Sequence, residues 1–285
     1  MDWRKLISAK RFGMEEFHEE RQENRSEFQR DYDRLIFSAP FRRLQNKTQV
    51  FPLPGSVFVH NRLTHSLEVA SVGRSLGDDV AKALMERHPE LQDSFLPEIG
   101  SIVSAACLAH DLGNPPFGHS GEKAISTFFS EGKGVRLKEK QPDGEQLSPM
   151  EWEDLTHFEG NANAFRILTH QFEGRRKGGF VLTYTTLASI VKYPFSSSLA
   201  GTKSKFGFFV SEEESFHKIA TELGLILLNE HPLKYARHPL VYLVEAADDI
   251  CYQMMDIEDA YKLKILTTEE TKELLMAYFS EERQE

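Results

Sequence analysis

An almost uninterrupted apolar segment constrains the fold of this chain more than any other feature of its sequence. Residues 97–112 carry apolar side chains at most helix positions, and residues 113–116, Gly-Asn-Pro-Pro, follow at the point where a helix must stop. Residues 62–87 also place apolar side chains at helical spacing along one face. Alternation typical of strands is sparse in the sequence. We therefore predict an all-α fold.

Shorter helices and two irregular segments are expected around these two helices. Residues 131–157 are polar and rich in Gly, Lys, Glu and Pro, and residues 196–212 begin with SSSLAGTKSKFG, so we predict flexible, solvated loops in both. An interface or regulatory role for these loops is the alternative. Residues 1–285 are expected to form one domain. The further helices are expected at 31–45 with an interruption at Pro40, 120–129 with Ser120 as a cap, 161–170, 185–193, 214–229 and 239–255.

Composition is that of a soluble globular protein. Of 285 residues, 40% are hydrophobic and 27% are charged. No apolar run reaches the roughly 18 residues needed to cross a bilayer, so we expect no membrane association. The N-terminal segment is too charged for a secretory signal. Cys107 and Cys251 lie in apolar helical patterns without CxxC spacing, which predicts buried thiols in a reducing cytoplasm.

The formal net charge of -10 disfavours nucleic acid as the main ligand, because surfaces that track phosphates are usually basic. Single-stranded nucleic acid stays open as an alternative partner, but the net charge does not support it. An acidic protein still binds a phosphate compound when its cations, or a metal ion, are concentrated in one pocket.

Ligand-type side chains interrupt three separate apolar helices. They are His65 in RLTHS, His110 and Asp111 in LAHDLG, and Asp248 and Asp249 in VEAADDI. A carboxylate on an apolar helix face costs several kcal/mol unless it is paired or metal-bound. Imidazole and carboxylate together suit a first-row divalent ion. Spacing alone leaves two readings open, which are a shared metal site and separate hydrogen-bonded core residues.

His119 and Glu122 follow this helix three residues apart, so they can share one face of the next helix. Glu122 would then accept a hydrogen bond from one imidazole nitrogen and leave the other free to exchange a proton. A capping histidine beside a solvated glutamate is the alternative.

Cations that could meet a phosphate chain are scattered along the sequence. Arg62 is the best candidate, because it lies three residues before His65 on the same helix. For the others, a solvated charge is the alternative. The further candidates are Arg43, Lys47 and Lys192, with Tyr193 as a hydroxyl donor.

Longer motifs around these residues resemble the HD-domain phosphohydrolase superfamily, and within it the bacterial deoxyguanosine-triphosphate triphosphohydrolases (dGTPases). The resemblance extends over about residues 30–260, and AHDLGNPPFGHSGE is its most specific motif. The other matching stretches are FRRLQNKTQVFPL, RLTHSLEVASVGR, HFEGNANAFRIL and EAADDICY.

The resemblance assigns roles to these residues. It implies a helical HD-domain core, in which His65, His110, Asp111 and Asp248 bind a divalent ion such as Mn²⁺ or Mg²⁺ and Asp249 is only a neighbour. His119 and Glu122 match the family's catalytic dyad. The residues it matches to substrate contacts are Gln49 at the sugar 3′-hydroxyl, Lys192 and Tyr193 at phosphate, and Asn161 and Tyr252 elsewhere in the pocket.

The implied activity is cleavage of a deoxynucleoside triphosphate, most simply dGTP, to deoxynucleoside and inorganic triphosphate. Another HD-type phosphohydrolase, such as a nucleotidase or phosphodiesterase, is the first alternative, and a non-catalytic nucleotide- or nucleic-acid-binding protein is the second. The family tends to form symmetric homo-oligomers, often hexamers. Its members usually continue well beyond the last metal aspartate, so we expect this chain to lack a C-terminal extension that adds base contacts.

Overall fold

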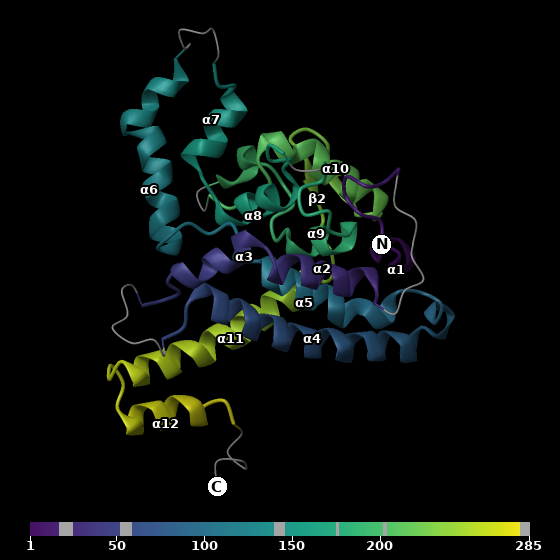
Figure 1. Ribbon diagram of the computed structural model, residues 1–285, viewed down its shortest axis with the longest axis vertical. Helices are drawn as coiled ribbons and strands as arrows, with labels where there is room; N and C mark the ends of the chain where they lie inside the picture. Colours follow the sequence, from purple (N-terminus) through teal and green to yellow (C-terminus); the bar gives the residue numbers. More distant parts are fainter. Residues whose placement is uncertain (17–24, 52–58, 140–145, 175–176, 202–203, 280–285) are drawn as a thin grey trace.

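The computed structural model describes residues 1–16, 25–51, 59–139, 146–174, 177–201 and 204–279 (Figure 1). Helices dominate these residues, which confirms the predicted all-α class. A two-stranded antiparallel hairpin, β1 (Leu227–Asn229) with β2 (Lys234–Tyr235), is the sheet within them. The α-helices are α1 Trp3–Leu6, α2 Glu27–Ile36, α3 Ala39–Arg43, α4 Arg62–Arg87, α5 Ile99–Ala109, α6 Gly118–Ser130, α7 Pro149–Thr156, α8 Gly160–Thr169, α9 Tyr184–Ile190, α10 Glu213–Glu222, α11 Val241–Lys262 and α12 Thr268–Met276.

Helix α5 is the centre of the core. All of its residues are buried, and α2, α4, α9 and α11 pack around it (Figure 1). Small residues allow α4 to lie close against it. A Cβ added at Gly77 would lie 2.7 Å from Gly100 Cα, and one added at Gly73 would lie 2.6 Å from Cys107 Sγ. The apolar run that ends at His110 therefore places that histidine deep in the molecule.

A buried ion cluster ties the N-terminal segment to this core. Arg11 Nη1 lies 2.7 Å from Asp31 Oδ1 on α2 and donates to Val181 O at 2.7 Å. Asp31 Oδ2 accepts from both the backbone N–H and the hydroxyl of Thr183, just before α9. Glu27 forms a further ion pair with Arg11. We call Arg11, Glu27 and Asp31 the enclosed cluster.

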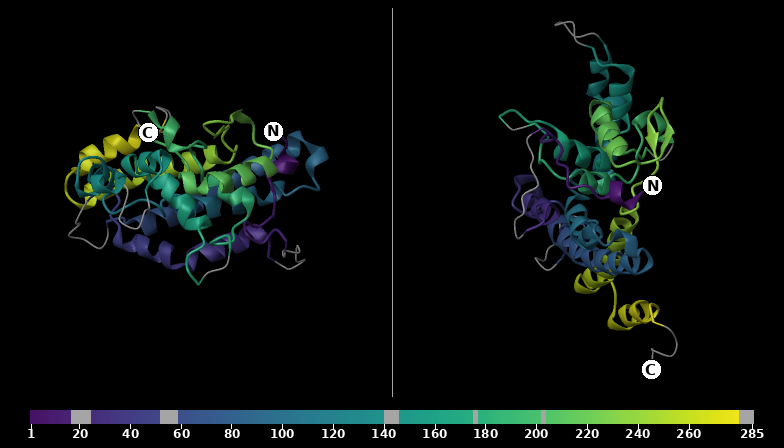
Figure 2. Two further views of the ribbon diagram at one scale, coloured as in Figure 1. Left: turned by 90° about the horizontal axis from the view of Figure 1, so that it is seen from above. Right: turned by 90° about the vertical axis from the view of Figure 1, so that its right-hand side faces the viewer.

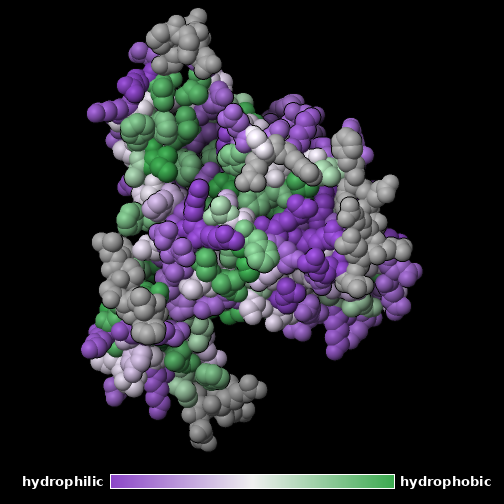
Figure 3. Space-filling view, viewed as in Figure 1, coloured by the Kyte–Doolittle hydropathy of each residue, from purple (hydrophilic) through white to green (hydrophobic). Residues whose placement is uncertain are grey.

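The prediction of a loop over residues 131–157 is wrong for its last part. Residues 149–156 form α7, which begins with a capping box between Ser148 and Glu151, and residues 133–138 form a 3₁₀ helix. Residues 140–145 lie outside the described part. Helices α6 and α7 pack side by side as an arm, opposite the end of the molecule that carries α12 (Figure 2). Apolar side chains gather on this arm in Figure 3, and exposed Phe128, Val135 and Met150 belong to it.

The second expected loop, residues 196–212, is irregular but not a solvated excursion. It contains two short 3₁₀ turns, and Phe206 and Phe208 are fully buried. Phe206 packs with Phe209 and with Ala162 of α8. The aromatic run hidden in KFGFF thus holds the segment against the body.

Three helix boundaries also differ from the sequence prediction. Helix α10 ends at Glu222 rather than 229, because Gly224 adopts a left-handed conformation with φ +66°. Ser120 is not a cap, since α6 begins at Gly118. The interruption predicted at Pro40 lies instead at residues 37–38, between α2 and α3, and Pro40 sits in the first turn of α3, where its missing N–H costs nothing.

Other expectations agree with the structure. Cys107 and Cys251 are buried and unbridged. Within the described residues, every helix is too short or too polar to cross a bilayer.

Candidate metal centre and substrate pocket

Three helices bring the ligand-type side chains together. A capping box between Asn61 and Thr64 starts α4 at Arg62, so His65 lies in its first turn and points into the core. His110 and Asp111 follow the last residue of α5. Asp248 projects from the middle of α11.

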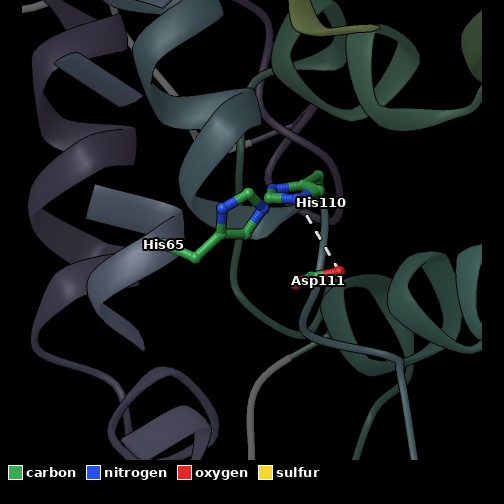
Figure 4. A group of neighbouring side chains, drawn as sticks. All are labelled: His65, His110 and Asp111. Carbon is green, nitrogen blue, oxygen red and sulfur yellow. Dashed lines mark ion pairs between the residues drawn. The ribbon is translucent and has the colours of Figure 1, made fainter. Parts of the chain in front are cut away.

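The donor atoms of these four residues are close neighbours. Asp248 Oδ1 lies 2.9 Å from His65 Nε2 and 3.5 Å from His110 Nε2. His110 Nε2 lies 3.7 Å from Asp111 Oδ1. Donor atoms of His65, His110 and Asp111 all lie within 4.8 Å of one another (Figure 4). Two donors that each lie about 2.1 Å from one ion are about 3.0 Å apart at a right angle, so these separations fit ligands of a shared cation.

The orientation of the two imidazoles also fits a metal ion. His110 Nδ1 lies 2.6 Å from Cys107 O, so this nitrogen donates to the carbonyl and Nε2 faces the cluster. His65 Nδ1 is buried and has no hydrogen-bond partner among the described residues. Burial lowers the pKa of His110, but the charges of Asp111 and Asp248 outweigh burial and raise this pKa to about 9. An imidazole between two carboxylates is a favourable place for a cation, whether a proton or a metal ion.

Asp111 is held from its other side. Arg62 Nη1 lies 2.7 Å from Asp111 Oδ2, and the side-chain amide of Asn114 donates to Asp111 Oδ1. Lys47 Nζ donates in turn to Asn114 O at 2.6 Å. Burial raises the pKa of Asp111, but His110 and Arg62 outweigh it, so the pKa lies below its usual range. The carboxylate is therefore ionised and fixed in direction.

A pocket of about 530 Å³ opens in front of this cluster. His65 lies behind its wall, fully buried. Arg43 is exposed on α3 and does not line the pocket, so the structure does not bring this candidate to the others. The candidates that do line it are His110, Asp111, Asp248, His119, Glu122, Gln49, Arg62, Asn161, Lys192, Tyr193 and Tyr252.

His119 and Glu122 form a hydrogen-bonded pair in the first turns of α6. His119 Nδ1 lies 2.8 Å from Glu122 Oε2. The side chain of His119 is 84% exposed, whereas that of Glu122 is 12% exposed. Burial raises the pKa of Glu122, but its hydrogen bonds with His119 and Gly160 outweigh burial and lower it. Glu122 is thus an ionised carboxylate that orients the histidine and leaves Nε2 toward the pocket.

Lys192, Tyr193 and Glu245 also line the pocket. Lys192 Nζ lies 2.9 Å from Glu245 Oε1 and 5.9 Å from the centre of the Tyr193 ring. Arg237 lies 5.6 Å from the same ring centre and also pairs with Glu245. The Glu245 carboxylate thus holds Lys192 at the pocket and Arg237 beside it.

Two further pocket residues differ in how their polar atoms are held. Gln49 Oε1 is buried without a partner among the described residues. Tyr252 is 46% exposed, and the charge of Asp256 and a hydrogen bond with that carboxylate raise the pKa of its hydroxyl. The carboxamide oxygen of Gln49 thus lacks a partner in the described part of the chain, whereas the Tyr252 hydroxyl has one.

Sequence reasoning missed several residues of this pocket. Asn114 lines it and holds Asp111, although it was read only as a helix terminator. Lys205 lines it from within an expected solvated loop. Phe117 adopts a left-handed φ of +65° at the start of α6 and stays exposed at the pocket, a conformation that costs of order 1 kcal/mol for such a residue. For Lys205, the apolar residues 206–209 that follow it were the one sequence signal that this segment packs against the body of the protein.

Comparison with known proteins gives the family. Residues 62–177, which carry His65, His110, Asp111, His119 and Glu122, match the HD domain family. Residues 62–177 of this chain thus carry an HD domain. Proteins named deoxyguanosinetriphosphate triphosphohydrolase-like are its homologues: it is 46% identical over 97% of its length to one from Pseudomonas aeruginosa (strain LESB58) and 45% identical over 93% to one from Synechocystis sp.. A protein of Yersinia enterocolitica named deoxyguanosinetriphosphate triphosphohydrolase is 36% identical over 95% of the chain. The resemblance to dGTPase-like proteins is therefore confirmed.

The matches cover nearly all of this chain but only part of the length of each relative. The chain spans 61% of the Pseudomonas and Synechocystis proteins and 57% of the Yersinia protein.

Proposed function

We propose that this chain is a metal-dependent phosphohydrolase that converts a deoxynucleoside triphosphate, dGTP above all, to deoxynucleoside and inorganic triphosphate. One observation carries the proposal: four metal-type donors from three helices converge at the wall of a pocket that also holds an imidazole–carboxylate pair and cations. The names of the relatives support the substrate class.

His65, His110, Asp111 and Asp248 would hold the divalent ion, with Mn²⁺ or Mg²⁺ as the first candidates. When bound, such an ion supplies polarisation of a phosphoryl oxygen and lowers the pKa of bound water. Four protein ligands would leave room for water and substrate in the coordination of such an ion.

The other residues bind, orient and move protons. Arg62 and Lys192 would offset the charge on the phosphates, and Tyr193 would donate a hydrogen bond to them. His119, oriented by Glu122, would exchange a proton at Nε2 with water or the leaving 5′ oxygen. The carboxamide of Gln49 would meet the 3′-hydroxyl, and Asn161 and Tyr252 would border the nucleoside.

The decisive experiment is chromatography of the products after incubation of each dNTP with the chain and Mn²⁺. Release of intact triphosphate supports the proposal. Release of monophosphate or pyrophosphate would point to another HD-type phosphohydrolase, and tight binding without turnover would point to a nucleotide-binding protein. The Asp111→Ala variant is the matched control for contaminating phosphatases, because it removes a metal ligand of the same pocket.

We also propose that the active form is a homo-oligomer, on the strength of the family resemblance alone. Light scattering after size-exclusion chromatography tests this, and a monomeric mass in an active sample would contradict it.

A further inference from the structure

A line of charged contacts leads from the buried Glu159 through Lys205 to the His119–Glu122 pair. Lys205 Nζ lies 2.8 Å from Glu159 Oε1 and 3.5 Å from Glu122 Oε2. Glu122 Oε2 is also the atom that lies 2.8 Å from His119 Nδ1. The lysine and the imidazole therefore share one carboxylate oxygen.

Glu159 fixes the far end of this line. It is fully buried and caps α8, where it accepts from the backbone N–H groups of Asn161 and Ala162. The side chain of Asn161 donates to Oε1 at 2.7 Å. These donors fix the position of the Glu159 carboxylate, and its contact with Lys205 Nζ therefore fixes the position of the ammonium group as well.

The backbone of Lys205 is fixed by its neighbours in the sequence. Phe206 is buried and packs with Ala162 in the first turn of α8, the helix that Glu159 caps. Gly207 N donates to Phe195 O at 3.1 Å. The lysine is thus part of the packed structure, and its side chain reaches Glu122 from a defined direction.

The second oxygen of Glu122 is held by backbone. Gly160 N donates to Glu122 Oε1 at 2.8 Å. A Cβ at position 160 would lie 2.9 Å from this oxygen and 2.1 Å from Asn114 Oδ1, so glycine permits the approach. Glu122 cannot turn its carboxylate without losing one of these contacts.

The contact between Lys205 and Glu122 matters because Lys205 carries a positive charge. Burial lowers the pKa of Lys205, but the charges of Glu159 and Glu122 outweigh burial and raise it. Lys205 is therefore a cation at neutral pH. A carboxylate shared with a cation stabilises a protonated imidazole less than an unshared carboxylate does.

We propose that Lys205 is a positioning residue that limits the charge Glu122 presents to His119 and thereby sets the pH at which His119 exchanges its proton. The inference rests on the proposed role of His119 in the reaction. Glu159 controls the same property from further away, because it draws Lys205 away from Glu122.

The test is a pair of variants with opposite expected signs. Lys205→Met removes the cation, so the titration midpoint of His119 should rise by about 0.5 to 1 pH unit. Glu159→Gln keeps an acceptor for the α8 cap but releases Lys205 toward Glu122, so the midpoint should fall. Lys205→Arg keeps the charge and should leave the midpoint near that of the unaltered chain.

Two readouts are needed. The first is the imidazole NMR titration of the metal-free chain, in which the His119 signal is the one lost in His119→Gln. The second is the pH dependence of kcat with Mn²⁺ and dGTP, whose limb should move in the same direction as the NMR midpoint. Lys82→Met is the matched control and should leave both readouts unchanged, because Lys82 is exposed on α4 and does not line the pocket.

The outcomes separate the hypotheses. An unmoved His119 midpoint in a folded Lys205→Met protein would overturn the inference. So would a tenfold loss of affinity for inorganic triphosphate with the midpoint unmoved, since Lys205 would then be a phosphate ligand. If the unaltered chain releases no triphosphate, the proposed function fails, whereas the NMR titration still decides whether Lys205 controls His119. Should Lys205→Met fail to fold, a fall of the midpoint in Glu159→Gln supports the inference and a rise or no change overturns it.

Discussion

Two clusters of buried charges in this protein differ in what lies beside them. In the enclosed cluster, Arg11 lies between Glu27 and Asp31, and backbone groups near α9 complete the contacts. The cluster around Asp111 has similar ion pairs, but it forms one wall of a pocket of about 530 Å³. Within the described part of the chain, the first cluster is buried among protein groups, and the second faces space that a ligand can enter.

The difference shows that buried charge alone does not mark a functional site. An enclosed ion pair serves to hold one arrangement of the chain, and its removal leaves an uncompensated charge. The open cluster instead lines a pocket with Arg62, Asp111 and Asp248, so its charges can meet a bound molecule. We therefore expect substitutions in the enclosed cluster to affect stability and substitutions in the open cluster to affect activity.

The largest effect is expected from Asp111→Asn in the open cluster. Loss of one anionic ligand should abolish Mn²⁺ binding in calorimetry and reduce turnover about a thousandfold or more. The free energy of unfolding of the metal-free protein should fall by less than about 2 kcal/mol, because Arg62 borders the pocket and gains water. Full activity of this variant would contradict the metal assignment.

The next effect separates chemistry from metal binding within the same pocket. His119→Gln should bind Mn²⁺ as the unaltered chain does, because His119 lies on α6 and outside the donor group. Its kcat should fall about 10²- to 10⁴-fold, since a proton-transfer group is lost. His88→Gln, at the exposed end of α4, is the control and should leave both measurements unchanged. Equal losses of metal affinity and turnover in His119→Gln would mean that the two sets of residues act as one.

The open cluster is the part of the molecule that the sequence predicts best. His110 and Asp248 stand out because they interrupt apolar helices, where a polar side chain needs a reason. Helix α4 was predicted with its bounds, since its apolar positions repeat over many turns. The roles of these residues remain predictions, whereas their proximity is a property of the structure.

Residues that act through tertiary contacts were not predictable in this way. Lys205 belongs to a stretch of serine, glycine and lysine that looks like a loop, and only the packing of Phe206 brings it to Glu122. The enclosed cluster joins Arg11 to Glu27 and Asp31, which follow it by 16 and 20 positions, and to Val181. No local sequence pattern links these residues. Helix α7 was missed for a different reason, because composition was weighed above the capping sequence Ser-Pro-Met-Glu.

The enclosed cluster should respond in the opposite way to the open one. Arg11→Met leaves Glu27 and Asp31 buried without their cation, so the free energy of unfolding should fall by about 3–5 kcal/mol in urea denaturation. Activity per folded molecule should not change. Arg25→Met is the matched control, since Arg25 forms an exposed ion pair with Asp33 and should cost less than about 1 kcal/mol. A loss of activity in folded Arg11→Met protein would show that the two clusters are coupled.

The smallest effect concerns a buried histidine that, unlike His110, has no charged partner. His238 Nε2 donates to Leu6 O at 3.1 Å, and Leu240 N donates to His238 Nδ1, so the ring is held in its neutral form. Burial lowers the pKa of His238 to about 4. The unfolded chain takes up a proton near pH 6.5, whereas the folded chain does so only near pH 4, so stability from this residue is complete above pH 6.5 and is lost as the pH falls between these values. The loss should reach about 3 kcal/mol at pH 4, because each pH unit below 6.5 contributes about 1.4 kcal/mol. His238→Gln can make both hydrogen bonds without titrating, so its unfolding free energy should depend less steeply on pH between 6.5 and 4. Parallel pH profiles of the two proteins would contradict this prediction. They would show that the folded state allows His238 to take up a proton as easily as the unfolded chain does, although the ring has no carboxylate beside it as His110 has.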